Sequence, residues 1–191
     1  MTTTVGLLAH PGIEILNFAG PYQVFATASS LAGGDEELFR LVTIGSSADP
    51  VTVGGGGCLL PDAAFAVHPP LACLIIPGGS LEVPTIERSL IDWLSSQVAS
   101  VPIVASVCTG AFLLAATGCL AGLTVTTHCE FTHILRQHFP DLDVVENRRW
   151  VDTGRFVTSA GRSAGIDMAL HLVERLASRE LAVATARRLE L

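Results

Sequence analysis

Cys108 is the residue of this sequence whose type and position best suit nucleophilic chemistry. It follows the apolar run 102–107, and helical spacing begins again after Gly110. This pattern predicts a buried strand, a sharp turn that carries the cysteine, and a helix. A thiol on such a turn lies beside unpaired N–H groups and the positive end of the helix dipole, which stabilise a thiolate. We therefore expect Cys108 to be exposed and acidic, although free cysteines are also frequent packing residues in cores.

The other cysteines carry no such signal. The chain has five cysteines, and none lies in a C-x-x-C pair, which fits reduced intracellular thiols better than disulfides or a zinc site. The histidines also lack the paired spacing of metal ligands. We expect no structural metal and no cofactor. Four cysteines are expected to pack in the core: Cys58, Cys73, Cys119 and Cys129.

Further candidate residues come where predicted strands end. The predicted strand 4–9 leads into a loop that contains Asn17. The predicted strand 71–76 leads into Pro77-Gly78-Gly79, and the predicted strand 123–127 leads into His128. Ligands of parallel α/β sheets bind beyond the carboxyl ends of the strands, so we expect these segments to meet Cys108 at one rim. Pro21 suits the first position of a helix, which places Asn17 just before that helix.

Strands and helices alternate along most of the chain, as a parallel sheet requires. Apolar residues at helical spacing predict helices over 86–98 and from Ser163 onward. Residues 150–158 form two alternating runs around a turn, which predicts an antiparallel hairpin. The glycines 54–57 indicate a hairpin connection, because no Gly-Lys-Ser/Thr follows to make a phosphate-binding loop. We expect residues 1–191 to form one α/β domain with a mostly parallel sheet, helices on both faces and a small antiparallel hairpin.

The overall composition is typical of a compact protein. Of the 191 residues, 49% are hydrophobic and 15% are charged, which is enough apolar surface for a sizeable core. No apolar run approaches the ~18 residues of a membrane span, and no basic segment leads into a secretory hydrophobic region. The net charge of −7 comes without a basic block, which disfavours a nucleic-acid surface. We expect a soluble, cytoplasmic protein that contacts no membrane.

Four motifs together resemble a known family. They are Ser-Val-Cys-Thr-Gly-Ala-Phe at Cys108, Pro-Gly-Gly at 77–79, Thr-Thr-His at His128, and Ser-Ala-Gly-Arg-Ser-Ala-Gly-Ile-Asp at 159–167. Their combination resembles the ThiJ/PfpI superfamily, within the class I glutamine amidotransferase-like fold. The resemblance covers nearly the whole chain and implies a three-layer, flavodoxin-like sandwich. Isonitrile hydratases and the N-terminal domains of AraC-type transcription regulators are the two branches that it resembles most.

This resemblance also implies a set of site residues. Cys108 would be the nucleophile, the backbone N–H groups of Gly79 and Thr109 would face the developing negative charge, and His128 would lie nearby. In the isonitrile hydratase branch, the aspartate of a Leu-Asp-x-x-Gly-Pro motif contacts the thiol, and Asn17 replaces it here. An amide can donate a hydrogen bond to a thiolate but cannot exchange a proton near neutral pH. For His128, a catalytic role and a packing role both stay open.

Two functions from different classes fit these residues. The first is an enzyme that adds water to a small electrophile such as an isonitrile through a thioimidate-type intermediate on Cys108, or a related cysteine-dependent hydrolase, weakened by Asn17. The second is a non-catalytic domain that senses small molecules, as in AraC-type regulators. Asn17 favours the second function. The end of the chain at Leu191 leaves no room for a DNA-binding module, which favours the first and predicts no direct nucleic-acid binding. A homodimer is also expected.

Overall fold

A seven-stranded, mostly parallel sheet forms the centre of the protein. The computed structural model describes residues 2–33, 37–80 and 87–191. The strands of the sheet are, in spatial order, β10 (Trp150–Asp152), β11 (Phe156–Ser159), β7 (Ile103–Val107), β6 (Cys73–Ile76), β1 (Thr3–Leu8), β2 (Phe39–Gly45) and β5 (Ala63–Ala64). Neighbouring strands are parallel except β10 and β11, which form the predicted antiparallel hairpin.

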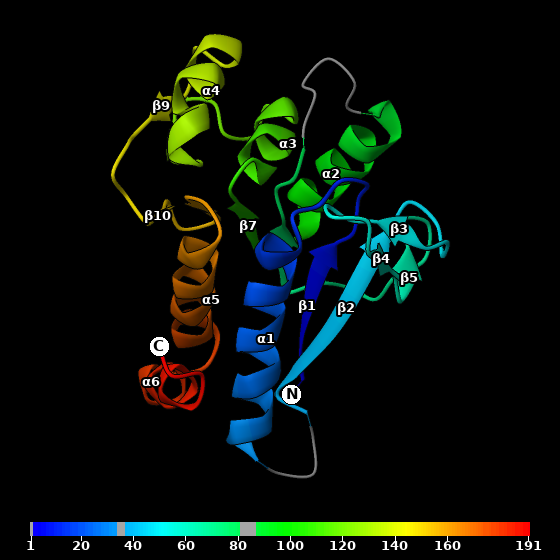
Figure 1. The fold of residues 1–191 in the computed structure, drawn as a ribbon, viewed down its shortest axis with the longest axis vertical. Helices are drawn as coiled ribbons and strands as arrows, with labels where there is room; N and C mark the ends of the chain where they lie inside the picture. Colours follow the sequence, from blue (N-terminus) through cyan, green and yellow to red (C-terminus); the bar gives the residue numbers. More distant parts are fainter. Residues whose placement is uncertain (1, 34–36, 81–86) are drawn as a thin grey trace.

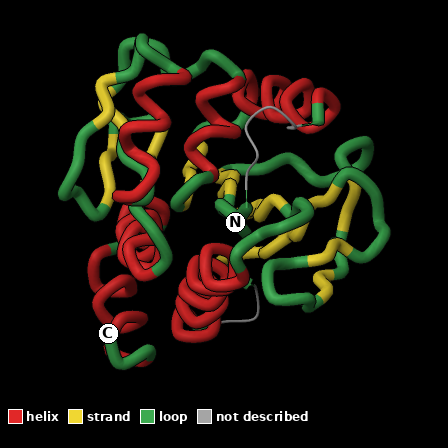
Figure 2. Tube along the Cα trace, turned by 45° about the horizontal axis from the view of Figure 1, so that its top comes forward, coloured by secondary structure: helices red, strands yellow, loops and turns green. Residues whose placement is uncertain are grey.

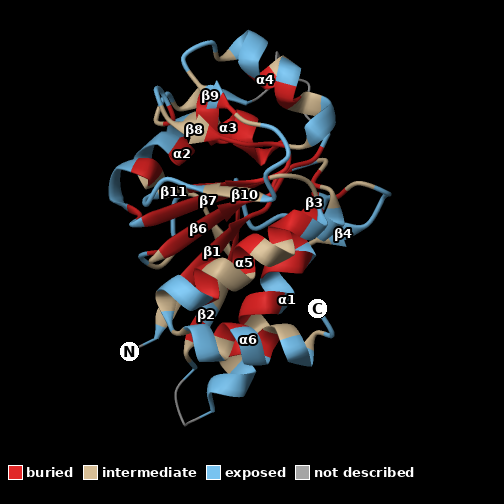
Figure 3. Cartoon of the chain, turned by 90° about the vertical axis from the view of Figure 1, so that its left-hand side faces the viewer, coloured by how far each residue is buried: buried red, intermediate tan, exposed pale blue. Residues whose placement is uncertain are grey.

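Helices cover both faces of this sheet (Figures 1 and 3). One face carries α1 (Ile15–Ala32), α5 (Ser163–Leu176) and α6 (Arg179–Arg188), and the other carries α2 (Arg88–Ser100) and α3 (Gly110–Ala116), with α4 (Thr132–His138) beyond α3. Outside the central sheet lie the hairpin of β3 (Val51–Thr52) and β4 (Cys58–Leu59), the parallel pair β8 (Thr124–Val125) and β9 (Asp143–Val144), and the 3₁₀ helix η2 (Cys129–Phe131). The three-layer, flavodoxin-like sandwich that we expected is therefore confirmed.

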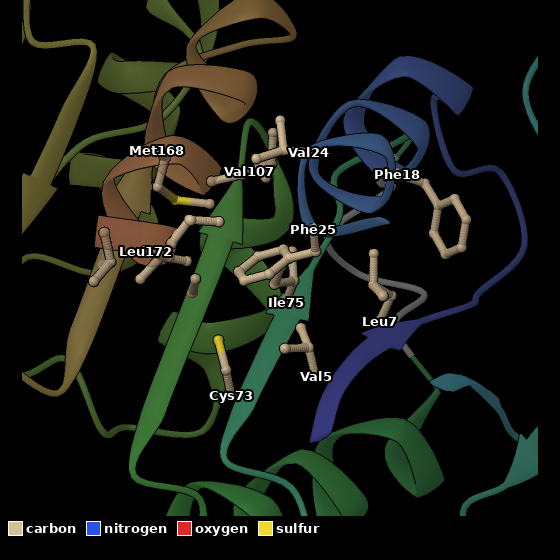
Figure 4. Packing of buried hydrophobic residues seen from close by; sticks show 14 of the residues in the cluster. Val5, Leu7, Phe18, Val24, Phe25, Cys73, Ile75, Val107, Met168 and Leu172 are labelled. Carbon is tan, nitrogen blue, oxygen red and sulfur yellow. The ribbon is translucent and has the colours of Figure 1, made fainter. Parts of the chain in front are cut away.

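Two layers of apolar side chains, one on each face of the sheet, hold the helices against the strands. In β7, Ala105 and Val107 belong to the layer under α1 and α5, whereas Val104 belongs to the layer under α2 and α3. Figure 4 shows Phe25 of α1 and Met168 of α5 in the first of these layers. Burying a large apolar side chain contributes about 1.5–3 kcal/mol. Because both faces of β7 are covered, all its residues are buried, and four of the five, all but Ser106, are apolar.

The first helix begins earlier than the sequence predicted. α1 starts at Ile15, so Asn17 lies in its first turn and Pro21 lies inside the helix. A proline inside a helix removes the N–H that would bond to the carbonyl four residues earlier, which is why we expected the helix to start there. The early turn is held instead by side chains, because Phe18 is buried in the core and Asn17 is hydrogen-bonded at both ends of its amide.

The predicted strand 123–127 is shorter than expected and lies outside the central sheet. Only Thr124 and Val125 form β8, which pairs with β9. The next two residues leave the strand because their hydroxyl groups bond to other segments: Thr126 donates to the carbonyl of Val145, and Thr127 donates to the carbonyl of Cys108. His128 therefore reaches the region of Cys108 through a loop and not from the end of a central strand.

The helices α5 and α2 and the hairpin at the glycines 54–57 can be compared with the predicted elements. The helix at Ser163 and the hairpin around 54–57 are confirmed as α5 and as β3–β4. Ile86 lies outside the described residues, and α2 begins at Arg88. α6 was not predicted; its start is capped by Ser178, and it packs against α5 near the C-terminus (Figure 2). No helix in the described part of the chain has the length and apolar character to cross a bilayer.

Candidate active site around Cys108

Cys108 lies on a sharp turn between β7 and α3, as the sequence predicted. Its φ of 58° is in the left-handed region, which side-chain-bearing residues rarely adopt and which is frequent at functional sites. The Cys108 N–H donates to the carbonyl oxygens of Ser159 and Ala160, at 3.1 Å each, so the end of β11 holds the turn. A side chain at Gly110 would clash with the carbonyl oxygen of Ile76, which explains the glycine at the start of α3.

The thiol of Cys108 is buried, with 7% of the residue exposed. Burial raises the pKa of this thiol, and the opposing effects are smaller: hydrogen bonds from Thr109 and Asn17, and the positive charge of Arg162. The prediction of an exposed, acidic thiol is therefore wrong. The N–H groups at the helix start do favour the thiolate as expected, but the loss of water around the sulfur outweighs them.

The remaining cysteines also differ from expectation. Cys73 is buried as predicted, and burial raises its pKa to about 12. Cys119 is half-buried, while Cys58 and Cys129 are exposed. Cys58 lies on β4 of the outer hairpin and Cys129 at the start of η2, two elements outside the central sheet that contact the core through the neighbouring residues Leu59 and Phe131. Their expected place in the core is therefore wrong, because the sequence pattern did not show that these elements lie outside the central sheet.

Asn17 is fully buried and joins three parts of the site. Its Nδ2 donates to the carbonyl oxygen of Gly78 at 3.0 Å, and its Oδ1 accepts from the N–H of Arg162 at 3.2 Å. It also lies beside the Cys108 thiol and lowers the pKa of that thiol. A carboxylate could accept from Arg162, but it could donate to Gly78 only in its protonated form. The amide therefore reproduces the hydrogen bonding of a protonated acid at every pH.

Gly79 and Thr109 are paired by two hydrogen bonds. The Gly79 N–H donates to Thr109 Oγ1 at 2.9 Å, and the Thr109 hydroxyl donates to the Gly79 carbonyl at 2.8 Å. The Thr109 N–H lowers the pKa of the Cys108 thiol. A Cβ at Gly79 would clash with the backbone at Gly12, so only glycine fits there. The resemblance assigns two N–H groups to the developing charge. The Thr109 N–H favours the thiolate of Cys108, whereas the Gly79 N–H donates to a hydroxyl group.

His128 lies beside the elbow. Its Nδ1 accepts from the N–H of Glu130 at 3.4 Å and lies 3.9 Å from a carboxylate oxygen of the same residue. Its ring packs against Gly161, where any Cβ would clash with it. Within the described segments, the hydrogen bonds and ion pairs of the His128 ring involve Glu130 and not Cys108. The structure therefore brings His128 near the site without a direct bond to the thiol.

Arg162 is a site residue that the sequence reasoning missed. It precedes α5 and has a φ of 43°, a second strained backbone position next to the thiol. Its N–H holds Asn17, and its charge lowers the pKa of Cys108. The motif Ser-Ala-Gly-Arg before a predicted helix was visible in the sequence, but the left-handed conformation of an arginine was not. Among the described residues, no group of three or more His, Cys, Asp or Glu side chains is arranged to hold a metal ion.

Comparisons with known proteins agree with this geometry. Isonitrile hydratase of Pseudomonas putida is 33% identical over 178 residues, which cover 92% of this chain and 73% of that protein. The HTH-type transcriptional regulator GbdR of Pseudomonas aeruginosa is 29% identical over 181 residues, which cover 95% of this chain and 48% of the regulator. The chain thus spans about half the length of that regulator.

The same relationship is seen in a solved structure and in a family profile. The crystal structure of a ThiJ/PfpI family protein from Pseudomonas syringae superimposes with a TM-score of 0.86 and 26% identity, over 100% of this chain and 75% of that chain. The profile of the DJ-1/PfpI family matches residues 3–175. This match covers all the elements from β1 to nearly the end of α5, including the elbow and the loop 77–79. The chain belongs to the DJ-1/PfpI family.

Proposed function

We propose that this protein is a cysteine-dependent enzyme of the isonitrile hydratase type, which adds water to a small isonitrile and releases an N-substituted formamide. The observation that carries the proposal is the elbow: Cys108 has a φ of 58°, and Thr109 and Asn17 lie beside its thiol, where both lower its pKa. Donors beside a reacting atom stabilise negative charge that develops there. The 33% identity to an isonitrile hydratase supports the choice of substrate.

The proposed hydration has two steps. The sulfur of Cys108 bonds to the terminal carbon of the isonitrile, and the thiol proton goes to that carbon, which gives a thioimidate. Water then adds to the same carbon and the C–S bond breaks. The oxygen of water becomes the formyl oxygen, and its two protons end on nitrogen and on sulfur. Because burial raises the pKa of Cys108, the resting thiol carries the proton that the first step needs.

A domain that senses a small molecule without turnover is the second candidate. Two observations favour it: Asn17 cannot exchange a proton, and the Gly79 N–H already donates to Thr109. The HTH-type regulator that matches 95% of this chain supports it too. In that function the elbow would line a ligand site, and a partner or a further segment would carry the response.

A turnover assay with a cysteine control separates the two candidates. We expect the protein to convert isonitriles to formamides, measured by mass spectrometry, in a screen that also contains small amides and aldehydes. Cys108→Ser should abolish conversion, while Cys129→Ser should leave it unchanged because that thiol is exposed and outside the elbow. Binding of an isonitrile by calorimetry with no conversion at any pH would contradict the enzyme and favour the sensor.

A further inference from the structure

Three consecutive carbonyl groups of the loop 77–79 each accept a hydrogen bond from a different side chain. His10 Nε2 lies 2.9 Å from the Pro77 oxygen, Asn17 Nδ2 donates to the Gly78 oxygen at 3.0 Å, and the Thr109 hydroxyl donates to the Gly79 oxygen at 2.8 Å. These three side chains come from the segment after β1, the first turn of α1 and the elbow. Asn17 and Thr109 also lower the pKa of the thiol, whereas the hydrogen bonds of His10 involve the carbonyl groups of Pro11 and Pro77.

His10 and its hydrogen bond to the Pro77 carbonyl oxygen are both buried. Only 4% of His10 is exposed, and its Nδ1 lies 3.0 Å from the carbonyl oxygen of Pro11. Burial lowers the pKa of His10, against a smaller raising effect of its two backbone contacts, so near pH 7 the ring is neutral and has one N–H. The Pro77 bond is the buried one, and leaving a buried carbonyl without a donor is costly, so this N–H belongs on Nε2.

The loop has little freedom to shift without disturbing the elbow. A Cβ at Gly78 would lie only 2.5 Å from the Thr109 nitrogen, which shows how closely the loop backbone approaches the residue after Cys108. The Gly79 N–H donates to Thr109 Oγ1, and the Ser80 N–H donates to the Gly12 carbonyl oxygen. At an active site, a displacement of about 1 Å can lower the reaction rate by up to about 10²-fold, so a small shift of this loop would matter.

We propose that His10 is a positioning residue: through the Pro77 carbonyl it fixes the loop 77–79, and with it the Gly79 N–H, against the Cys108 elbow. Asn17 and Thr109 hold the other two carbonyls, so loss of His10 frees one end of the loop and leaves the elbow itself intact. The proposal depends on the proposed function only for its kinetic test. Its structural test stands alone.

Hydrogen exchange of the loop amides is the structural test. His10→Leu removes the donor, and His10→Gln keeps an N–H at a similar reach. By NMR, we expect the amides of Gly79 and Ser80 to exchange at least about 10-fold faster in His10→Leu and at close to the wild-type rate in His10→Gln. The amide of Leu7 in β1, inside the central sheet, should stay unchanged and so exclude a global loss of stability.

His68 supplies a matched control. Like His10 it precedes a proline and contacts a proline carbonyl, with Nδ1 2.9 Å from the Pro69 oxygen, but its other nitrogen accepts from Trp93 and not from the loop 77–79. His68→Leu should leave exchange at Gly79 unchanged. If His10→Leu does not fold, His10→Asn replaces it, because the shorter amide cannot reach Pro77. Unchanged exchange at Gly79 in the variant without the donor, or an equal acceleration in His10→Gln, would overturn the proposal.

The kinetic test separates this proposal from the proposed function. If the wild type hydrates isonitriles, we expect His10→Leu to lower kcat about 10-fold with little change in KM, and His10→Gln to restore kcat. A rise in KM at constant kcat would contradict a positioning role. If the wild type shows no turnover, the proposed function fails, but the exchange experiment still decides whether His10 fixes the loop.

Discussion

At Cys108, a backbone that favours a thiolate is combined with burial that opposes it. Burial raises the pKa of the Cys108 thiol by more than Thr109, Asn17 and Arg162 lower it. A group whose folded pKa is raised stays protonated to higher pH. The reactivity of this thiol therefore depends on what reaches it, because a small neutral molecule enters a buried site more easily than a charged reagent does.

Alkylation of the cysteines tests this balance. From about pH 7 to about pH 10, on either side of the usual thiol pKa of about 8.5, we expect iodoacetamide to modify Cys58 and Cys129 before Cys108. The rate at Cys108 should still be rising at the upper end of this pH range, because burial raises the pKa of its thiol. Peptide mass spectrometry measures the three rates. Faster modification of Cys108 than of Cys129 at pH 7 would show that the elbow donors outweigh burial.

Asn17 offers a second test at the scale of one residue. An aspartic acid there would be buried, which favours its protonated form, and the protonated acid could donate to Gly78 as the amide does. We expect Asn17→Asp to raise isonitrile turnover by at least about 10²-fold at low pH, with the gain falling as the acid ionises. Asn17→Leu should lose the bonds to Gly78 and Arg162 and turn over more slowly than the wild type.

If the wild type is already fast and Asn17→Asp changes neither the rate nor its pH profile, the amide position carries no acid function. The proton would then come from the thiol itself or from water. If the Asn17→Asp variant binds an isonitrile but does not convert it, the result would instead favour the sensing function.

At the scale of elements, Asp152 ties the β10–β11 hairpin to α5. Its carboxylate accepts from His171 Nε2 at 2.6 Å, from Arg175 at 2.9 Å and from the Gly154 N–H at 2.7 Å. Burial alone would raise the pKa of Asp152, but these hydrogen bonds and the positive charge of Arg175 together hold it below its usual value. Because the folded pKa is the lower one, the stabilisation is present above the unfolded pKa and is lost as the pH falls through the folded pKa.

We expect Asp152→Asn to lower Tm at pH 7 by on the order of 2 °C, as for a partly exposed ion pair in a chain of this size. The difference from the wild type should shrink below the unfolded aspartate pKa of about 3.9. Asp92, in an exposed pair with Arg88, is the control, and Asp92→Asn should change Tm less. Calorimetry between about pH 3 and about pH 7 gives the Tm of the wild type and of both variants as a function of pH. A difference that grows on acidification would contradict the assignment.

The start of α3 provides a packing test. Gly110 leaves no room for a methyl group against the Ile76 carbonyl, whereas a Cβ at Gly57 would meet only a Val53 methyl group at 3.2 Å. We expect Gly110→Ala to destabilise the protein by about 1–3 kcal/mol and Gly57→Ala by less. Denaturant unfolding measures both. Equal effects would mean that the backbone around the elbow can shift to admit a methyl group.

The sequence predicted the innermost strands β6 and β7 well because both are buried on both faces and appear as mostly apolar runs. It could not show how α1 starts, because Pro21 signals a helix start, whereas the turn before it is held by tertiary contacts of Asn17 and Phe18. Nor could it place β8, whose partner β9 is set by tertiary contacts. The motif at Cys108 revealed the elbow, but the pKa of the thiol depends on burial, which local pattern does not encode.

For the whole molecule, we expect a symmetric homodimer, the commonest closed assembly of identical chains. Analytical ultracentrifugation at micromolar concentration should then give a mass twice the 20.0 kDa of one chain. The same experiment with Cys58→Ser and Cys129→Ser under reducing conditions should give the same mass, which excludes a disulfide between exposed cysteines. A single species of 20.0 kDa would contradict the prediction.

The close backbone contacts between the loop 77–79 and the elbow also limit how this site can be redesigned. Gly78 and Gly79 face neighbouring backbone, so a library that varies them would yield mostly unfolded proteins. Ile15 and Leu16 differ, because they are exposed on the same first turn of α1 that carries Asn17. Directed evolution toward a new substrate should therefore accumulate its changes on that helical turn, while the loop and the elbow stay constant.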